Sequence, residues 1–425
     1  MSDANTQQPH QDAAAWRWPG VAAMRRGAGR RGGMRALLRS ASFVEWRYYA
    51  VLSEAFHGIV GLALVNPEQR FGAVAEGGLL LIVAGVLDRP RLPASAAADA
   101  PPLLAPAPAA FCWMHLFATT DCTFDATGPG SLTAGDAECC IALAHQGPAA
   151  ADIEIEAGAG LLLRCAHTGL AGAALPTIQG RDFPGPLGSG WLGAHWTVDC
   201  PAPIARSHGT LMLGDGLLTP LAQGPGDTAG WATPALRARL AAGDSHWSWD
   251  GAAGYYEHSF GVRPLPLQGW DFLFAPDAKT GNAVVLQTYR GSRALRYLDV
   301  CWQADGGGQH QHRFNAESLT LTWPERLSDP VLGVRRALVR QVEAAADGLR
   351  LQLTNRVLHR LPLLRRDKLA VRHFFISEEI GIADWTLTDS GGAVLAAARG
   401  LPCGGELAHF RLRTPRPRPK RNTRN

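Results

Sequence analysis

Short stretches in which apolar and polar residues alternate recur along most of the chain. The segment Asp152-Ile153-Glu154-Ile155-Glu156 alternates most cleanly. A period of two residues is typical of a β-strand that buries one of its faces. In the first half of the chain, this pattern predicts strands at 45–52, 58–65, 79–87, 111–118, 138–144, 153–156, 161–167 and 191–199.

The second half of the chain shows the same alternation, with two helical interruptions overall. We expect one helix at 232–242, opening after Thr233-Pro234, and another at 331–338. The strand at 191–199 is expected to end at Cys200-Pro201-Ala202-Pro203, because proline cannot donate a hydrogen bond to a sheet. Further strands are predicted at 284–289, 294–303, 318–323, 349–357, 369–376 and 382–389.

Turn-forming residues separate these strands, since the 425 residues include 48 glycines and 29 prolines. Many short strands with almost no helix predict an all-β fold, in which antiparallel sheets close into barrels or pack as sandwiches. The length is that of about two domains, and a barrel of about eight to ten strands can enclose one lipophilic ligand. We expect a disordered basic extension at 1–42, a β domain with the candidate site at 43–268, a second β domain at 269–410 and a disordered basic tail at 411–425.

The net charge of +4 is unevenly distributed along the chain. Residues 1–42 carry a net charge of +5 and residues 411–425 carry +7, so that the body carries −8. An acidic body is not expected to bind nucleic acid, because nucleic-acid binders carry their basic residues on the folded surface. We favour solvated ends; peripheral contact of these ends with anionic lipid at the inner face of a membrane is the alternative.

The cysteines and the hydropathy pattern indicate a cytoplasmic protein. The eight cysteines are scattered and none forms a Cys-x-x-Cys pair, so a zinc site is not expected and reduced thiols are. The N-terminus is polar and then arginine-rich, without the apolar segment of a secretory signal. The longest apolar run, at 77–87, is shorter than the roughly 20 residues of a membrane span.

Two short motifs would suggest a cofactor or a metal in other surroundings. A G-x-G-x-x-G sequence occurs at 188–193, but no strand leads into it and no helix follows. His310-Gln311-His312 lies in a glycine-rich turn without a carboxylate motif, which favours a structural role. Neither G-x-S-x-G nor G-x-x-x-x-G-K occurs. The chain therefore lacks the usual motifs of hydrolases, kinases and dehydrogenases.

The densest group of aromatic residues surrounds two ionisable side chains, Glu257 and His258. A carboxyl group among aromatic rings is poorly solvated, which favours its neutral, proton-donating form. Glu257 is therefore the candidate acid, whereas Trp247 and Trp249 are assigned to the core. The aromatic residues of this segment are Trp247, Trp249, Tyr255, Tyr256, Phe260, Trp270 and Phe272.

Three segments together resemble those of one enzyme family. They are the stretch 46–53, which begins Trp46-Arg47-Tyr48-Tyr49; the pair His195-Trp196, followed by Pro201; and the stretch 254–261, followed by Pro264-Leu265 and Trp270-Asp271. In this order they resemble the opening strand, the His-x-Trp segment and the Gly-Tyr-x-Asp segment of the carotenoid 1,2-hydratases (hydroxyneurosporene synthases). The resemblance covers a little over half of the chain. It implies tandem lipocalin-like domains, as in the lipocalin-like Diels–Alderases and tocopherol cyclases, a lipophilic substrate and no cofactor.

The resemblance also assigns roles to individual residues. Neutral Glu257, with Tyr255 beside it, would protonate a terminal alkene of a carotenoid, an isoprenoid or another polyene to give a tertiary carbocation. His195 or His258 would hold the water that captures this cation. The substrate-binding aromatic residues would be Trp196, Trp270, Tyr256, Tyr48 and Trp46.

Two other functions fit the same residues. A cofactor-free cyclase or isomerase would use the same acid and rings, with an internal alkene in place of water or with a pericyclic reaction. A non-catalytic carrier would bind a lipid or a carotenoid unchanged. The oligomeric state is left open by the sequence.

Overall fold

The computed structural model describes most of the region that was predicted to fold. The residues it describes are 18, 43–65, 78–89, 108–125, 130–158, 160–179, 196–218, 230–262, 269–290, 295–304, 306–329, 334–366 and 372–412.

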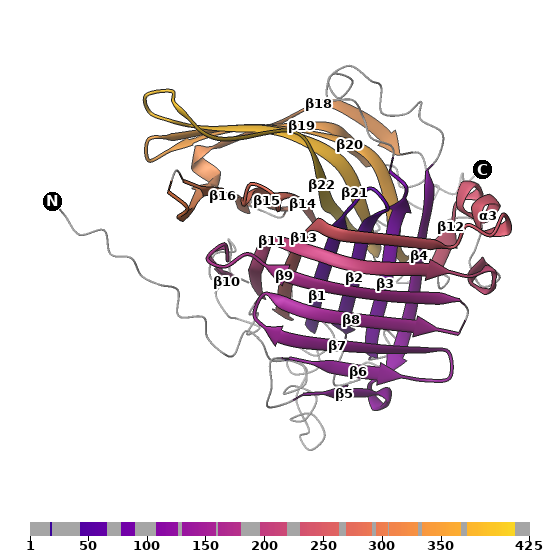
Figure 1. The fold of residues 1–425 in the computed structure, drawn as a ribbon. Coiled ribbons are helices and arrows are strands. Elements are labelled where there is room, and N and C mark those ends of the chain that lie inside the picture. The colour runs from indigo at the N-terminus through magenta and orange to yellow at the C-terminus, as the bar shows by residue number, and fades with distance from the viewer. Residues whose placement is uncertain are drawn as a thin grey trace, which may run out of the picture.

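The first sheet contains thirteen strands in the described part of the chain, and all their pairings are antiparallel (Figure 1). Twelve strands follow one another in the order β12-β4-β3-β2-β1-β13-β11-β9-β8-β7-β6-β5, and β10 pairs with β11. Their bounds are β1 (Phe43–Leu52), β2 (Phe56–Val65), β3 (Gly78–Leu87), β4 (Ala109–Ala118), β5 (Cys122–Phe124), β6 (Leu132–Gly135), β7 (Cys139–Gly147), β8 (Ala150–Ala157), β9 (Leu161–Gly169), β10 (Ile178–Gln179), β11 (Trp196–Leu213), β12 (Gly230–Ala232) and β13 (His246–Val262).

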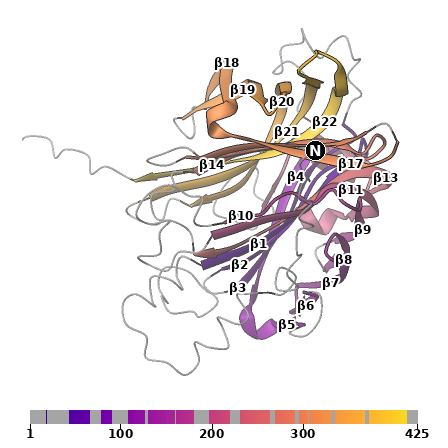
Figure 2. The ribbon, with the colours of Figure 1, turned by 90° about the vertical axis from the view of Figure 1, so that its left-hand side faces the viewer.

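In the part of the chain that the structure describes, the second sheet contains nine strands in the order β17-β16-β15-β14-β22-β21-β20-β19-β18. Within the described residues, no ladder joins the two end strands of either sheet, so each is an open, curved sheet (Figures 1 and 2). The bounds are β14 (Gly269–Asp277), β15 (Asn282–Arg290), β16 (Leu295–Gln303), β17 (Gln309–Asn315), β18 (Leu319–Asp329), β19 (Val334–Ala346), β20 (Leu349–Arg366), β21 (Arg372–Asp389) and β22 (Val394–Leu412).

Helices are few in the described residues. The predicted helix after Thr233-Pro234 is confirmed as α3 (Pro234–Ala241), and the Thr233 side chain accepts a hydrogen bond from the Leu236 N–H at its first turn. The remaining helical turns are short, at η2 (Thr119–Asp121), η4 (Asp215–Leu218) and η5 (Ala316–Ser318). The helix expected at 331–338 is wrong for its described part, because β19 begins at Val334 and pairs with β18.

Proline does not end the strand that contains Trp196, contrary to the expectation. β11 continues through Pro201 and Pro203 to Leu213, and its register against β13 shifts between Asp199 and Ala202 and again between Ala202 and Ala205. Such irregularities accommodate proline, because the missing N–H falls where the ladder is already interrupted.

Three large hydrophobic cores and one small cluster, which contains Trp196, result from this arrangement in the described residues. One fills the interior of the first sheet, one lies between the two sheets, and one fills the interior of the second sheet. Figure 2 shows the two sheets lying against each other. The predicted all-β fold with two tandem antiparallel units is therefore confirmed. The limits of the two domains stay a prediction.

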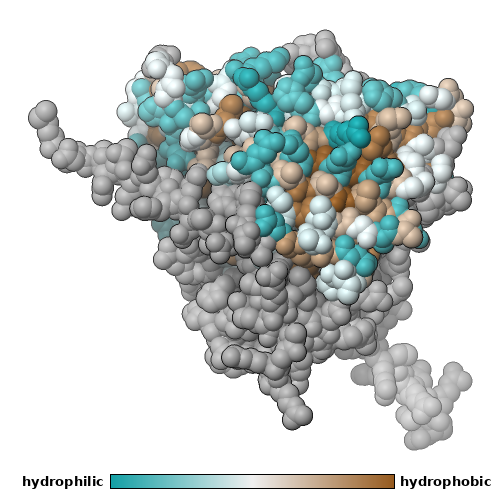
Figure 3. Space-filling view, turned by 60° about the horizontal axis from the view of Figure 1, so that its bottom comes forward, coloured by the Kyte–Doolittle hydropathy of each residue, from teal (hydrophilic) through white to brown (hydrophobic). Residues whose placement is uncertain are grey.

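Two further features concern the outside of the molecule. Seen from the side of β5, hydrophobic residues gather in one zone of the described surface between hydrophilic ones (Figure 3). Among the described helices, none is both long and apolar enough to cross a membrane.

Candidate functional site

Strand alternation sorts the predicted site residues onto two faces of the first sheet. On β13, Tyr255 belongs to the core between the sheets, and Tyr256 belongs to the interior of the first sheet. Side chains two residues apart share a face, so Glu257 follows Tyr255 toward the second sheet and His258 follows Tyr256 into the interior. Adjacent positions therefore have separate surroundings.

The Glu257 carboxyl group accepts two hydrogen bonds on the inter-sheet face. The Tyr255 hydroxyl donates to one oxygen at 2.8 Å, and the Ser259 hydroxyl donates to the other at 2.7 Å. Burial raises the pKa of Glu257 above its usual value, although the two hydrogen bonds act in the opposite direction. The side chain keeps partial solvent exposure. Glu257 is thus a carboxyl group with raised proton affinity that water can still reach.

The second sheet supplies a carboxyl group that was not predicted, Glu378 of β21. The Tyr48 hydroxyl donates to its Oε1 at 2.5 Å, and Tyr48 is also the ladder partner of Glu257. Glu378 is 1% exposed, and its Oε2 is buried without a hydrogen-bond partner. Burial raises its pKa well above the usual value, and the carboxylate of Glu406 raises it further. Tyr48 thus donates to a carboxyl group of the second sheet and lies opposite Glu257 in its own sheet.

Glu406 of β22 is a third carboxyl group at this place. It is paired with Glu378 in the β21–β22 ladder, so both side chains point toward the first sheet. The Trp270 indole N–H donates to the Glu406 carboxyl group. Burial, and then the carboxylates of Glu257 and Glu406, raises the pKa of Tyr289. We call the group Tyr48, Tyr255, Glu257, Ser259, Trp270, Tyr289, Glu378 and Glu406 the inter-sheet site.

Aromatic rings form the floor of the inter-sheet site. Tyr255 stacks on Phe274 of the second sheet, with ring centroids 4.4 Å apart and planes at 15°. Tyr48 meets both rings edge-on, with its centroid 5.8 Å from that of Phe274. Trp46 and Trp270 pack against the same core and remain partly exposed. Aromatic rings and carboxyl groups therefore lie together on the face between the two sheets.

Trp196 lies at the edge of this face. It is buried with Ile178 and Val198 in a small cluster against which Tyr289 packs. Tyr48 and Tyr255 thus lie beside Glu257, and Trp46, Trp196 and Trp270 lie on the same face.

Tyr256 and His258 occupy the interior of the first sheet instead. Tyr256 stacks on Tyr49, with centroids 4.5 Å apart, and its hydroxyl accepts a hydrogen bond from Arg47 at 3.2 Å. The His258 Nε2 lies 2.9 Å from a carboxylate oxygen of Glu45. This placement corrects the expectation that Tyr256 and His258 act beside Glu257, since the backbone layer of the sheet separates them from it.

The last predicted residue, His195, lies outside the described residues. Among the residues that the structure describes, no group of three or more His, Cys, Asp or Glu side chains could hold a metal ion.

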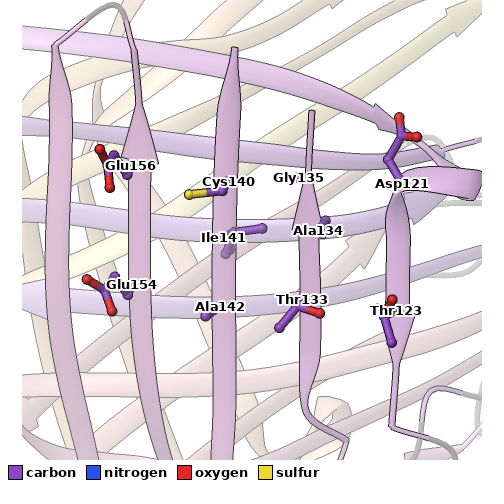
Figure 4. A pocket seen from close by; sticks show the side chains of 10 residues that line it. All are labelled: Asp121, Thr123, Thr133, Ala134, Gly135, Cys140, Ile141, Ala142, Glu154 and Glu156. Carbon is purple, nitrogen blue, oxygen red and sulfur yellow. The ribbon is translucent and has the colours of Figure 1, made fainter. Parts of the chain in front are cut away.

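A surface hollow of about 390 Å³ lies far from the inter-sheet site, on the exposed face of β5 to β8 (Figure 4). Glu154, Glu156 and Asp121 extend over it as separate surface carboxylates. It lacks the aromatic floor and the buried groups of the inter-sheet site, and we assign it no part in the chemistry.

Sequence reasoning missed Glu378 and Glu406. Glu378-Glu379 reads as an exposed charged pair, and the stretch around Glu406 contains glycines that obscure its alternation. A signal was nevertheless present, because Ile376, Glu378 and Ile380 occupy alternate positions. A lone carboxyl group on an otherwise apolar strand face is costly to bury and so marks a special environment.

Comparison with known proteins gives matches only among solved structures. No model of a known protein family and no curated protein matches the chain. The structure is similar to that of CghA with Sch210972, with a TM-score of 0.49 and 11% identity over 86% of this chain and 88% of that one. It is also similar to a putative AttH from Nitrosomonas europaea, with a TM-score of 0.45 and 13% identity over 86% of this chain and 92% of that one.

Proposed function

We propose that the chain is a lipocalin-like, cofactor-independent enzyme that protonates an alkene of a lipophilic polyene at the inter-sheet site. The observation that carries the proposal is Glu257, a carboxyl group of raised pKa held by Tyr255 and Ser259 against an aromatic face. A neutral carboxyl group in an apolar site is suited to donate a proton at neutral pH. The hydratase resemblance selects water as the group that captures the cation.

In the proposed reaction, Glu257 both donates the proton and takes one up again at the end. The Glu257 carboxyl group gives its proton to a terminal alkene carbon, and the π electrons form the new C–H bond. Tyr255 and Trp270 stabilise the resulting tertiary carbocation through their ring faces. Water adds to the cation, and the Glu257 carboxylate takes up the proton that the added water loses. This cycle needs neither His195 nor His258.

Cyclisation or isomerisation is the second candidate, and Glu378 favours it. A second carboxyl group on the opposite sheet is positioned to accept a proton from a carbon beside the cation, which would end the reaction in a new alkene. Hydration adds the mass of water to the substrate, whereas cyclisation and isomerisation leave the mass unchanged. The mass of the product therefore separates the two candidates.

The test compares lipophilic extracts of polyene-producing cells that express the wild type or Glu257→Gln. Loss of a general acid typically costs about 100-fold or more in rate, so we expect the product to disappear from the Glu257→Gln extract. Glu154→Gln, which changes an exposed carboxylate on the outer face of β8, is the matched control. A carrier would give a different result: the polyene in the wild-type extract would be unchanged, and the purified protein would contain the same polyene as a bound ligand.

A further inference from the structure

Two buried carboxyl groups face each other across one ladder of the second sheet. Directly opposite residues of an antiparallel pair have Cβ atoms about 5 Å apart, and Glu378 and Glu406 are such a pair. Their exposed fractions are 1% and 6%. Two carboxylates this close in an apolar core repel each other strongly, which favours a proton shared between them.

The environment of Glu378 leaves one acceptor open. Its hydrogen bond comes from the Tyr48 hydroxyl, and the Gly405 backbone N–H also lowers its pKa; both groups are neutral. The charged groups that act on its pKa most strongly are two carboxylates, Glu406 and Glu379. The buried Oε2 has no hydrogen-bond partner. An unmet buried acceptor costs free energy unless a ligand supplies the missing partner.

The surrounding aromatic rings favour a ligand that carries a positive charge. Tyr48, Tyr255 and Phe274 pack within 6.1 Å of one another, centroid to centroid, on the face that carries the carboxyl groups. Aromatic faces attract cations, and this attraction is strongest where water is excluded. Glu257, which lies beside Tyr255, adds a third carboxyl group to the same face.

We propose that the inter-sheet site selects ligands that carry a positive charge on a lipophilic chain, such as an alkylammonium ion, and excludes carboxylates and phosphates. The inference rests on the proposed function for the location of the ligand, and it names the charge class that the site accepts. A carbocation formed from a neutral polyene belongs to this class, and an ammonium ion of similar shape is its stable counterpart.

The experiment measures the binding of three probes of equal chain length to the full chain by titration calorimetry, each below its micelle concentration. The probes are decyltrimethylammonium, decanol and decyl sulfonate. We expect decyltrimethylammonium to bind about tenfold or more tightly than decanol, and decyl sulfonate to bind more weakly than either. Equal affinity for the cation and the alcohol, or preference for the sulfonate, would overturn the inference.

Two double variants locate the charge preference. In Glu378→Gln/Glu406→Gln, the cation is expected to bind within about twofold of decanol, because the negative charge of the pair is removed with little change of shape. Glu154→Gln/Glu156→Gln removes two exposed carboxylates from β8 and should keep the full preference. The reverse outcome would assign the preference to the surface and refute the proposal. Glu378→Gln alone gives the same readout with a smaller loss.

These outcomes are distinct from those of the proposed function. If Glu257→Gln leaves the products unchanged while the cation preference and its loss in Glu378→Gln/Glu406→Gln are observed, the proposed reaction fails and the ligand class stands. If products depend on Glu257 but the three probes bind alike, the reaction stands and the charge preference fails.

Discussion

His167 lies in the interior of the first sheet, and its environment makes it sensitive to acid. Its side chain is 2% exposed, and neither ring nitrogen has a hydrogen-bond partner. Burial lowers the pKa of His167 from 6.5 to about 4. The unfolded chain therefore binds a proton at a higher pH than the folded one, and stability is lost as pH falls from about 6.5 toward 4.

We expect His167→Leu to make the protein less sensitive to acid. Between pH 7 and pH 4 the wild type should lose up to about 3 kcal/mol of unfolding free energy through this residue, and the variant should not. At pH 7 the substitution should be neutral or stabilising, since it removes an unsatisfied polar group. Urea unfolding at several pH values measures the difference.

His208→Leu is the matched control for this prediction. His208 is exposed on β11 beside Asp250, so its replacement removes an imidazole ring and leaves the buried ring of His167 in place. A profile that His167→Leu leaves unchanged would contradict the assignment of acid sensitivity to burial of this ring.

At the scale of elements, Arg340 of β19 holds strands together behind the inter-sheet site. Its guanidinium group donates to Asp271 of β14 at 2.7 Å and to Asn355 of β20 at 2.8 Å, and it also contacts Glu379 of β21. Asp271 and Glu379 directly follow Trp270 and Glu378, which face the other way. The buried ion pairs thus fix the strands that carry the site.

Arg340→Met is expected to destabilise the protein by about 3–5 kcal/mol, because Asp271 would stay buried without its cation and Glu379 would keep only Arg360. Chemical unfolding measures this change. Arg164→Met breaks the exposed Arg164–Glu154 pair of the first sheet and should cost at most about 1 kcal/mol. Similar losses in the two variants would show that burial does not decide the contribution of the pair.

A comparison of the strands shows which parts of the fold can be predicted from the sequence. Strands such as β8 and β9 were predictable because only one face is buried, and apolar residues then occupy every second position. The sequence of β13 does not show such an alternation of apolar and polar residues. Both of its faces pack against protein, so aromatic residues occur at consecutive positions and hide the alternation.

Apart from Trp270 of β14, the part of the site that was predicted from the sequence lies on the first sheet. Tyr255 and Glu257 are close in sequence to other aromatic residues, which exposed their unusual surroundings. Glu378 comes to the same site through the packing of a separate sheet, and its contact with Tyr48 joins residues 330 positions apart. Local patterns carry no information about such a contact. The separation of Glu257 from His258 follows from strand alternation, once β13 is known to be a strand.

At the scale of the whole molecule, the two sheets share one apolar core. Residues from β1 to β4 and from β11 and β13 pack against residues of β14 to β16 and of β20 to β22. Phe274 contacts both Tyr48 and Tyr255 of the other sheet, and Phe272 contacts Tyr255 as well. Each sheet therefore depends on its partner to keep this face from water.

We expect a chain truncated after residue 268 to expose the inter-sheet face. It should aggregate or bind a hydrophobic dye strongly, because large exposed apolar patches are association sites, and the full-length chain should do neither. Light scattering and dye fluorescence measure the two effects. A soluble monomeric fragment with the full-length protein's low dye binding would contradict this account of the core.

Because β1 and β13 form a single backbone layer with different chemistry on its two faces, the site constrains how such a protein can evolve. Substitution at alternate positions of β13 can alter ligand preference while leaving the interior of the first sheet intact. Insertion or deletion of one residue within the strand exchanges the faces, which would carry Glu257 into the interior and His258 toward the ligand. New ligand specificities should therefore arise by point substitution in β13, and the length of this strand should vary less than its sequence during evolution.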